Sequence, residues 1–244
     1  DIIDGTITST ITVAVDDANS DDDFDSVADE TVSATTTDDD VAGFTIVESD
    51  GSTEVDESGT TDTFTVVLDA EPNSDVVLTI SSDDTGEATV TNALTFSSAN
   101  WDTPQTITIT GADESILDGN QDTTITVTID DANSDNNFDS VADQTISATT
   151  TDDDVAGFTI VESDGSTEVA ESGTTDTFTI VLDAEPSSNV VVAMSSSDTG
   201  EATLSGTITF TSANWDTPQT VTVTGVDENI IDGNQSSTVT ITIV

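Results

Sequence analysis

The sequence predicts an all-β protein made of tandem, antiparallel β-sandwiches of the immunoglobulin-like kind, with about seven strands in each repeat of 114 residues. Three observations predict this fold. The sequence repeats itself at a fixed offset, and its apolar residues alternate with polar ones at a period of two. Short breaks that are polar or contain glycine or proline separate the strand candidates.

The repeat is the clearest feature of the chain. VAGFTIVESDGSTEV, which begins at Val41, returns at Val155, and NWDTPQT returns at the same offset of 114 residues. Between 41–130 and 155–244, 66 of 90 aligned positions are identical. We therefore expect a long tandem array as the parent, represented here by three segments. These are the C-terminal strands of a truncated repeat (1–40), a complete sandwich (41–154) and a repeat that lacks its last strand (155–244).

Within the complete repeat, five segments have the composition of short strands. Most of them alternate β-branched apolar residues with threonine, which is typical of a strand with one buried face. The candidates are FTVVL at 64–68, VVLTI at 76–80, TITIT at 106–110, TTITVTI at 123–129 and TISATT at 145–150. The breaks between them include SDG from Ser49, AEPNSD from Ala70 and GADESILDGNQD from Gly111.

Aromatic residues provide the candidate core. Phe44, Phe64, Phe96 and Trp101, together with the isoleucine and valine residues, are expected to fill the sandwich, while threonines coat its solvent face. This interpretation makes Trp101 and its counterpart Trp215 plugs of the core at a loop, in preference to stacking platforms for a carbohydrate. A β-barrel is the less favoured all-β alternative.

The composition is extreme in charge. The chain has 51 acidic residues and no lysine, arginine or histidine, for a formal charge of −51. No ion pair between side chains can form, and two carboxylates ~5 Å apart repel each other by roughly 1 kcal/mol even in water. High charge often means disorder, but the apolar third of this chain is patterned, so a fold that gathers cations is expected instead.

The missing residue types exclude several functions. Without histidine, lysine, cysteine or tyrosine, most general bases and covalent nucleophiles are absent, so an enzyme is not expected. Without lysine or arginine, the chain cannot grip phosphate, so nucleic acid is not an expected partner, and anionic membranes would repel it. No stretch approaches 18 consecutive apolar residues, so direct membrane insertion is not expected either.

Four motifs resemble those of Calx-β repeats, the β-sandwiches of sodium/calcium exchangers and of large bacterial surface proteins. VDESG at 55–59 looks like the family's V-x-E-x-G, and GEATVTNALTF at 86–96 stands where the family has a segment leading to a TF strand. TITGADESILDG at 108–119 is similar to the family's acidic loop, and TTTDDD at 149–154 to its closing carboxylate run. The four motifs together cover nearly the whole repeat.

The resemblance implies a Ca²⁺ cluster at one end of each sandwich. In the complete repeat it implies as ligands Glu57, Glu87, Asp113, Glu114, Asp118, Asp152, Asp153 and Asp154. In the following repeat the matching residues are Glu171, Glu201, Asp227, Glu228 and Asp232, and in the preceding one Asp4, Asp38, Asp39 and Asp40.

Metal chemistry supports calcium independently of the resemblance. Ca²⁺ takes 6–8 oxygen ligands in flexible geometry, which carboxylates from several loops can supply. Zinc and copper prefer imidazole or thiolate, and the chain has neither. The alternative is solvated surface charge. Between the two repeats, 13 of 18 acids are retained, the same fraction as for all residues, so the case for calcium depends on spacing and loop position.

A second acidic segment, DDANSDNNFDSVAD at 130–143, alternates Asp and Asn as an EF-hand loop does. However, Asn136 stands where the turn glycine belongs and Ala142 where the bidentate glutamate belongs. An Asp/Asn-rich hairpin loop is therefore the favoured interpretation, with metal binding there as the alternative. The oxygen donors of the alternating pattern would be Asp131, Asn133, Asp135, Asn137 and Asp139.

These observations favour a structural role. We expect a repeat of an extracellular filament or giant adhesin stalk, rigidified by Ca²⁺ that the acidic loops bind at the junctions between repeats. The alternatives are an adhesion module that binds a carbohydrate or a protein, and an acidic halophile surface protein without specific metal sites. The expected partners are neighbouring repeats of the same chain or filament. Other cells or surfaces would be reached through parts outside this segment. Separate subunits joined by strand complementation remain an alternative to one giant chain.

Overall fold

The computed structural model describes residues 2–91, 93–231 and 233–244, and in them the predicted all-β fold is confirmed. Three short 3-10 helices accompany the strands: η1 (Asp22–Phe24), η2 (Asp131–Asn133) and η3 (Asn136–Phe138). The strands are β1 (Ile7–Val13), β2 (Glu30–Thr36), β3 (Phe44–Glu48), β4 (Thr53–Asp56), β5 (Thr61–Leu68), β6 (Val76–Ser82), β7 (Ala88–Val90), β8 (Ala93–Phe96), β9 (Gln105–Gly111), β10 (Gln121–Ile129), β11 (Gln144–Thr151), β12 (Phe158–Glu162), β13 (Thr175–Leu182), β14 (Val190–Ser196), β15 (Ala202–Leu204), β16 (Ile208–Phe210), β17 (Gln219–Gly225) and β18 (Val239–Ile243).

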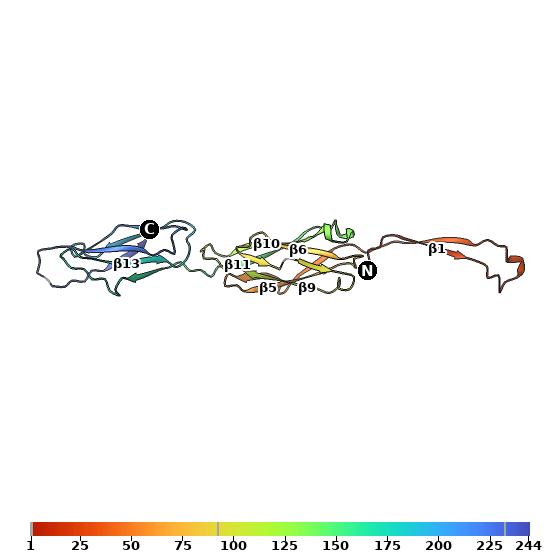
Figure 1. Ribbon diagram of the computed structural model, residues 1–244, viewed down its shortest axis with the longest axis horizontal. Coiled ribbons are helices and arrows are strands. Elements are labelled where there is room, and N and C mark those ends of the chain that lie inside the picture. Colours follow the sequence, from red (N-terminus) through yellow and green to blue (C-terminus); the bar gives the residue numbers. More distant parts are fainter. Residues whose placement is uncertain (1, 92, 232) are drawn as a thin grey trace. The chain divides into compact units, whose positions relative to one another are not determined.

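The first sandwich consists of two facing sheets. One has the strand order β3-β5-β9-β7 and the other the order β4-β11-β10-β6-β8. In Figure 1, β6 and β10 lie in one layer, and β5 and β9 lie in the other. Strand pairing is antiparallel, with Phe64 of β5 opposite Ile107 of β9 and Ile129 of β10 opposite Leu78 of β6. Both pairs are buried, so the two sheets turn their apolar faces toward each other.

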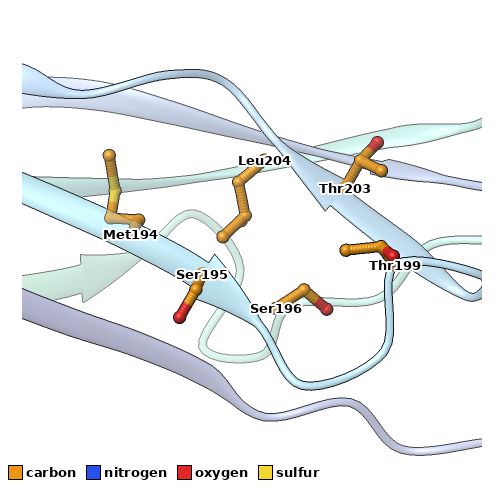
Figure 2. Close-up of a pocket in the computed structure, with 6 residues that line it drawn as sticks. All are labelled: Met194, Ser195, Ser196, Thr199, Thr203 and Leu204. Atoms are coloured by element: carbon orange, nitrogen blue, oxygen red, sulfur yellow. The ribbon is translucent and has the colours of Figure 1, made fainter.

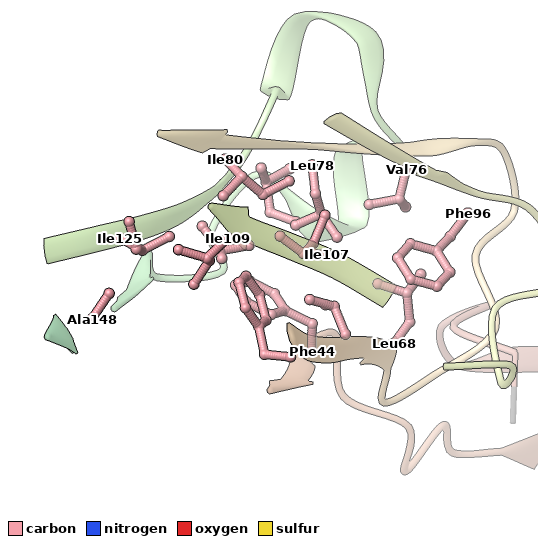
Figure 3. Packing of buried hydrophobic residues seen from close by; sticks show 14 of the residues in the cluster. Phe44, Leu68, Val76, Leu78, Ile80, Phe96, Ile107, Ile109, Ile125 and Ala148 are labelled. Atoms are coloured by element: carbon pink, nitrogen blue, oxygen red, sulfur yellow. The ribbon is translucent and has the colours of Figure 1, made fainter. Parts of the chain in front are cut away.

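The core follows the period of two that the sequence displays. In β9 and β10 every second residue is buried, and the threonines between them are half-buried or exposed. Figure 3 shows Leu78, Ile107 and Ile109 among the side chains that fill the space between the sheets. The predicted core residues Phe44, Phe64 and Phe96 are at most 2% exposed. Trp101 is half-buried and packs against this core, as expected for a plug.

The second sandwich has fewer strands among the described residues. Its sheets have the orders β12-β13-β17-β15 and β16-β14-β18. In the first sandwich, TEVD at 53–56 forms β4 because it pairs with β11. The nearly identical TEVA at 167–170 forms no strand, because the described chain places no counterpart of β11 beside β18. Pairing, and not local propensity, therefore decides whether this segment is a strand.

The hairpin of β1 and β2 is the third part of the fold. The two strands pair antiparallel from Ile7 opposite Thr36 to Val13 opposite Glu30, and all of their residues are exposed. Figure 1 shows this hairpin as a two-stranded ribbon. By the offset of 114, β1 and β2 are the counterparts of β10 and β11, which are built into the first sandwich.

The chain divides into two compact units. The first contains 1–55, 59–111 and 122–149, and the second contains 56–58, 112–121 and 150–244. Three loop segments near the end of the first sandwich thus belong to the second unit. Among the described residues, no helix is long and apolar enough to span a membrane.

Aspartates hold several turns of the sandwiches together, a role that the sequence analysis missed. Asp62 accepts hydrogen bonds from Ser49 Oγ (2.8 Å), from the Thr63 amide (2.6 Å) and from the Glu54 amide (3.0 Å). Asp176 accepts the same three hydrogen bonds in the second sandwich. Burial raises the pKa of Asp62, but these hydrogen bonds lower it by more, so the pKa lies below its ordinary value.

The Asp/Asn-rich segment at 130–143 is a structured loop, as the favoured interpretation predicts. Asp135 is buried and accepts hydrogen bonds from the amides of Asn73 (2.6 Å), Ser74 (3.0 Å) and Asn137 (3.0 Å). Phe138 follows on η3 and is fully buried. Since both oxygens of Asp135 are engaged by backbone amides, this carboxylate anchors the loop to the turn at 73–74.

We expect the substitution Asp62→Ala to lower the free energy of unfolding at neutral pH by about 1 kcal/mol, since three hydrogen bonds are lost at a partly solvated site. The pKa of Asp62 is lower in the folded state than in the unfolded state. The difference from the parent chain should therefore be fully present above about pH 4, and it should vanish as the pH falls through the folded value. Urea unfolding at several pH values measures it.

The exposed Asp50 provides the matched control for this experiment, because Asp50→Ala removes the same charge. Equal effects of the two substitutions would show that charge alone, and not the hydrogen bonds of Asp62, matters.

Candidate metal centre

Three segments meet at one pole of the first sandwich, and all three belong to the second unit. They follow β4 (56–58), connect β9 to β10 (112–121) and follow β11 (150–154). The Glu57 amide donates a hydrogen bond to the Thr151 carbonyl (3.2 Å). Asp152 accepts hydrogen bonds from the Gly119 amide (2.7 Å) and from the Asp154 amide (2.8 Å). Backbone contacts therefore hold the three acidic segments together.

Glycine makes the turns of this pole. Gly59 and Gly119 have φ values of +88° and +78°, in the left-handed region that L side chains rarely adopt. Before the first turn, Asp56 accepts a hydrogen bond from the Ser58 amide (2.9 Å), and its interaction with Ser58 lowers the pKa of Asp56. The glycine of the VDESG motif is thus required by the backbone, and the turn fixes where Glu57 lies.

The carboxylates gather into two groups that share Glu57. In each group, every residue offers one oxygen that lies within 4.8 Å of the others. Two oxygens that bind one Ca²⁺ at about 2.4 Å can be at most about 4.8 Å apart, so this spacing suits a calcium ion. The first group is Glu57, Glu87, Glu114 and Asp118, and the second is Glu57, Asp152 and Asp154.

Burial makes this accumulation of negative charge costly. Glu57 is fully buried and Glu87 is only 7% exposed. An ionised carboxylate in a protein interior is strongly destabilising unless a positive charge accompanies it, and this sequence encodes no cationic side chain. No side chain of this sequence can supply that positive charge.

The surroundings of Asp154 also disfavour its charged form. Its Oδ2 atom is buried and has no hydrogen-bond partner. Burial, followed by the charges of Asp152, Asp153 and Asp113, raises the pKa of Asp154 above its ordinary value. A cation placed among these oxygens would bind the Oδ2 atom of Asp154 and offset the repulsion that raises its pKa.

The donor set defines which cation fits. One group offers four carboxylates and the other three, and Ca²⁺ takes oxygen ligands of this kind at 2.3–2.6 Å, with carbonyls and waters able to complete its 6–8 ligands. Mg²⁺ keeps several of its waters and uses fewer carboxylates. The residues present therefore fit calcium best.

Two of the predicted ligands of this repeat lie outside both groups. Asp113 and Asp153 are exposed, and they act on the centre through their charge, as the raised pKa of Asp154 shows. Asp152 has a second role that sequence reasoning did not find, since each of its oxygens accepts a backbone hydrogen bond.

The second sandwich does not gather its predicted residues in the same way. Glu171, Glu201 and Glu228 are half-buried, Asp227 is exposed, and Asp232 lies outside the described residues. Among the residues that the structure describes, these acids form no group of three or more with metal-binding spacing. The first sandwich obtains Asp152 and Asp154 from the segment after β11, and the described chain places no counterpart of that segment beside Glu171.

The hairpin of β1 and β2 keeps part of the hydrogen-bond pattern seen at the pole of the first sandwich. Asp38 accepts hydrogen bonds from the Gly5 amide (2.7 Å) and from the Asp40 amide (3.0 Å), as its counterpart Asp152 does in the first sandwich. The backbone hydrogen bonds of Asp40 and then Gly5 lower the pKa of Asp38. Asp4 and Asp39 are exposed, and neither they nor Asp38 and Asp40 belong to a metal-binding group among the described residues.

A scan against protein-family models and a search of curated proteins gave no match. Among solved structures, domains 4 and 5 of the S-layer protein SbsC are 20% identical over 59% of this chain, with a TM-score of 0.35, and the match spans 57% of that chain. The calcium-binding domain CBD12 of CALX1.1 is 14% identical, with a TM-score of 0.33 and coverage of 81% of this chain and 80% of that one.

The chaperone DraB of E. coli is 8% identical, with a TM-score of 0.34 and coverage of 77% of this chain and 89% of that one. The solved structures similar to this chain thus include Calx domains, the family that the sequence motifs resemble. At these scores, function has to be argued from the chain's own residues.

We expect Glu57→Gln to have opposite effects with and without calcium. In a chelator, the variant should unfold at a higher urea concentration than the parent chain, because a buried charge is gone. In millimolar Ca²⁺ it should unfold at a lower one, with about 10-fold or more weaker calcium binding by calorimetry. Asp131→Asn changes the same charge at an exposed position that follows the other end of β10, and it should do neither. Destabilisation of Glu57→Gln by the same amount in both buffers would contradict the assignment.

Asp154 gives the metal-free protein a distinct pH dependence. Its pKa is higher in the folded state than in the unfolded state, so the stability of the fold should fall as the pH rises from the ordinary value of about 3.9 through the folded value. We expect Asp154→Asn to remove this part of the fall in chelator. Thermal unfolding between pH 3.5 and 7 checks it, and identical pH profiles for the two chains would refute it.

Proposed function

We propose that these repeats form the structural stalk of an extracellular filament or adhesin, and that Ca²⁺ bound by the acidic pole rigidifies the junction between repeats. The observation that carries the proposal is the buried carboxylate of Glu57, gathered with Asp152 and Asp154 in a chain without a single cationic side chain. A cation shared by these oxygens supplies the charge that folding of the pole requires.

The path of the chain links this centre to the next repeat. Only Val155, Ala156 and Gly157 separate Asp154 from β12, which begins at Phe158. A flexible Gly/Ser linker would decouple the two sandwiches, but three residues leave little freedom. An ion held by Asp152 and Asp154 therefore also fixes the exit of the chain toward β12.

A second link runs through the loop between β9 and β10. This loop carries Glu114 and Asp118, and its backbone pairs with Glu185 of the following repeat. The Leu117 amide donates to the Glu185 carbonyl (3.1 Å), and the Glu185 amide donates to the Ser115 carbonyl (2.6 Å). The same kind of contact recurs 114 residues earlier, where the Ile3 amide donates to the Glu71 carbonyl (3.4 Å). A cation that orders the loop would therefore also order the backbone contact of residues 115–117 with Glu185, which we call the joint.

Calcium levels outside cells suit such a site. Extracellular calcium-binding modules work with dissociation constants of roughly 10⁻⁴–10⁻³ M, and a site on loops with two exposed neighbours, Asp113 and Asp153, need not bind more tightly. The absence of lysine and arginine also removes every cleavage site for trypsin-like proteases, which favours survival outside the cell.

The pocket in Figure 2 and the two tryptophans give less support to a ligand-binding module. The pocket in Figure 2 is lined by side chains without an aromatic ring or a charge, from Met194 to Leu204 on β14, β15 and the turn between them. Trp101 and Trp215 pack against the two cores instead of standing free for a sugar. Their carbonyls accept hydrogen bonds from the amides of Leu68 and Leu182, both 3.1 Å long.

We expect millimolar Ca²⁺ to slow amide exchange at the joint, at residues 115–117 and at 185, and to stiffen the 244-residue chain in small-angle scattering relative to chelator. The double variant Asp152→Asn/Asp154→Asn should lose both responses, while the exposed control Asp131→Asn keeps them. A halophile surface without specific sites predicts the opposite pattern, in which molar NaCl stabilises the chain and millimolar Ca²⁺ changes nothing. That result would overturn the proposal.

A further inference from the structure

We propose that each sandwich has a docking site for the preceding repeat, at the end of the sandwich remote from its carboxylate centre, and that this site works without a cation. In the first sandwich the site combines the Glu-Pro turn after β5 with Asp135 and Asn137 of the Asp/Asn-rich loop. Its occupant is the pair of apolar residues at the tip of the β9–β10 loop of the preceding repeat. The inference rests on the function proposed above in taking neighbouring repeats as the partners, but it does not depend on calcium.

Strand β10 separates the docking site from the carboxylate centre of the first sandwich. The loop before β10 carries Glu114 and Asp118 of the centre, and the Asp/Asn-rich loop follows Ile129 at the other end of the strand. At about 3.3 Å per residue, the nine residues of β10 place the two loops roughly 30 Å apart. The docking site is therefore a second site and not a part of the centre.

A proline prepares the Glu-Pro turn for pairing. Pro72 follows Glu71 in the first sandwich, and Pro186 follows Glu185 in the second. Because a proline disfavours the helical region for the residue before it, both glutamates favour extended backbone. Each of them forms an isolated parallel β-bridge with the same position of an incoming loop, as Glu185 does with Ile116. The turn thus offers one extended residue as the partner of that loop.

The same turn holds the first strand of its own sandwich. The Asp69 amide donates a hydrogen bond to the Gly43 carbonyl (2.9 Å), and Thr45 Oγ1 donates one to Asp69 Oδ1 (2.8 Å). A side chain at Gly43 would collide with the Asp69 carboxylate, and the same holds for Gly157 and Asp183 in the second sandwich. A loop docked on this turn is therefore tied to the segment through which the chain enters the sandwich.

Two carboxamides converge on the incoming loop at the first sandwich. The Ile3 carbonyl accepts hydrogen bonds from Asn73 Nδ2 (2.6 Å) and from Asn137 Nδ2 (3.2 Å), and we call these two asparagines the amide clamp. Beside it, Ile2 forms the parallel bridge with Glu71, and Ile3 packs against the core of the sandwich. Backbone pairing, the amide clamp and apolar contact thus all act on one pair of residues.

Asp135 positions the amide clamp. This buried carboxylate accepts hydrogen bonds from the backbone amides of Asn73 (2.6 Å), Ser74 (3.0 Å) and Asn137 (3.0 Å). It therefore fixes the backbone from which both carboxamides extend. The alternation of Asp and Asn, which is similar to that of a metal-binding loop, here directs hydrogen-bond donors toward a carbonyl.

The chemistry of the contact explains why docking needs no cation. The groups that meet are backbone amides and carbonyls, carboxamides and apolar side chains, and all of them are neutral. Each of the three copies of the loop carries two adjacent apolar residues before Asp-Gly, at 2–3, 116–117 and 230–231. In a chain of charge −51, a neutral contact lets two repeats meet without adding to their repulsion.

The chain has no cysteine, so an engineered pair tests docking directly. Ile116→Cys/Glu185→Cys should form an intramolecular disulfide on mild oxidation, in chelator as well as in millimolar Ca²⁺, because bridge partners lie within reach of a disulfide. Ile116→Cys/Ser188→Cys moves one cysteine beyond the proline and should oxidise about 10-fold more slowly or not at all. The loss of free thiols, followed by mass spectrometry, measures both rates. Equal rates for the two pairs would overturn docking.

The amide clamp is tested at the first sandwich. Asn137→Ala should accelerate hydrogen exchange of the Ile3 amide about 5-fold in chelator, since one hydrogen bond to the incoming loop is lost. Asn136→Ala changes the exposed neighbouring position of the same loop and should leave this rate as it is. Exchange measured by NMR distinguishes the two, and equal acceleration by both variants would contradict the clamp.

Ser187→Asn tests the clamp by a gain of contact, because Ser187 occupies the position of Asn73 in the second sandwich. The new carboxamide should reach the carbonyl of Leu117, the counterpart of Ile3, and slow exchange of the Leu117 amide about 5-fold. Ser188→Asn, one position later, should not change this rate. The same exchange rate in the two variants would count against the clamp.

Asp135 is a positioning residue, so its effect should be local. Asp135→Asn keeps an acceptor oxygen and should retain most of the protection of the Ile3 amide that Asp135→Ala loses. Exchange in β5 and β9 should be the same in both variants. If exchange in β5 and β9 rises together with that of Ile3, Asp135 stabilises the sandwich as a whole, and its role in positioning the clamp is wrong.

Docking and calcium binding can fail separately. If Ile116→Cys/Glu185→Cys cross-links in chelator but calorimetry detects no Ca²⁺ binding, the calcium function is wrong while docking stands. If the chain binds Ca²⁺ but the two cysteine pairs oxidise at equal rates, docking is wrong while the calcium function stands. If the cross-link forms only in Ca²⁺, the proposal of a site that works without a cation is wrong.

Discussion

The lack of any cationic side chain in the sequence constrains how this structure can accommodate its acids. An ordinary sandwich can bury a glutamate beside an arginine, whereas here Glu57 is enclosed at a pole where all the gathered side chains are carboxylates. The remaining ways to stabilise acids inside the protein are backbone amides and external cations. Asp62, Asp135 and Asp176 use the amides, and the pole of the first sandwich uses carboxylate spacing that suits a divalent ion.

The acids therefore fall into two classes, those that accept hydrogen bonds from backbone amides and those that gather at the pole of the first sandwich. Where backbone amides point at a carboxylate, as the Glu54 amide does at Asp62 and the Asn73 amide does at Asp135, the acid is stabilised without a cation. At Asp62 burial raises the pKa, but the hydrogen bonds lower it by more. Where several acids converge, burial and then the repulsion of neighbouring charges raise the pKa, as at Asp154. Asp152 belongs to both classes, since it accepts hydrogen bonds from two backbone amides and also contributes an oxygen to the group with Glu57 and Asp154.

Much of the fold could be predicted from the sequence, because the period of two and the 114-residue repeat are strong signals. The core positions of Phe44, Phe64 and Phe96 follow directly from them. The different fates of TEVD at 53–56 and TEVA at 167–170 could not be predicted from local sequence, since pairing with β11 decides them. For the site, the spacing pointed to loops whose carboxylates the structure brings close together. It could not separate the inward Glu57 from the outward Asp113 and Asp153, because short acidic runs carry no periodicity that shows which way each side chain faces.

The three-residue junction between Asp154 and β12 has a consequence for how such a protein can change in length. In the proposed array, the pole of each complete repeat would draw on residues from the counterpart of Glu57 to the counterpart of Asp154, so the array could grow or shrink only in whole steps of 114 residues. Unequal recombination between aligned copies of the gene meets this condition wherever the crossover falls, because the repeats share 66 of 90 positions. The near-identity of the repeats would thus allow the length of the protein to change during evolution through the number of repeats, without a change in the contacts between neighbouring repeats.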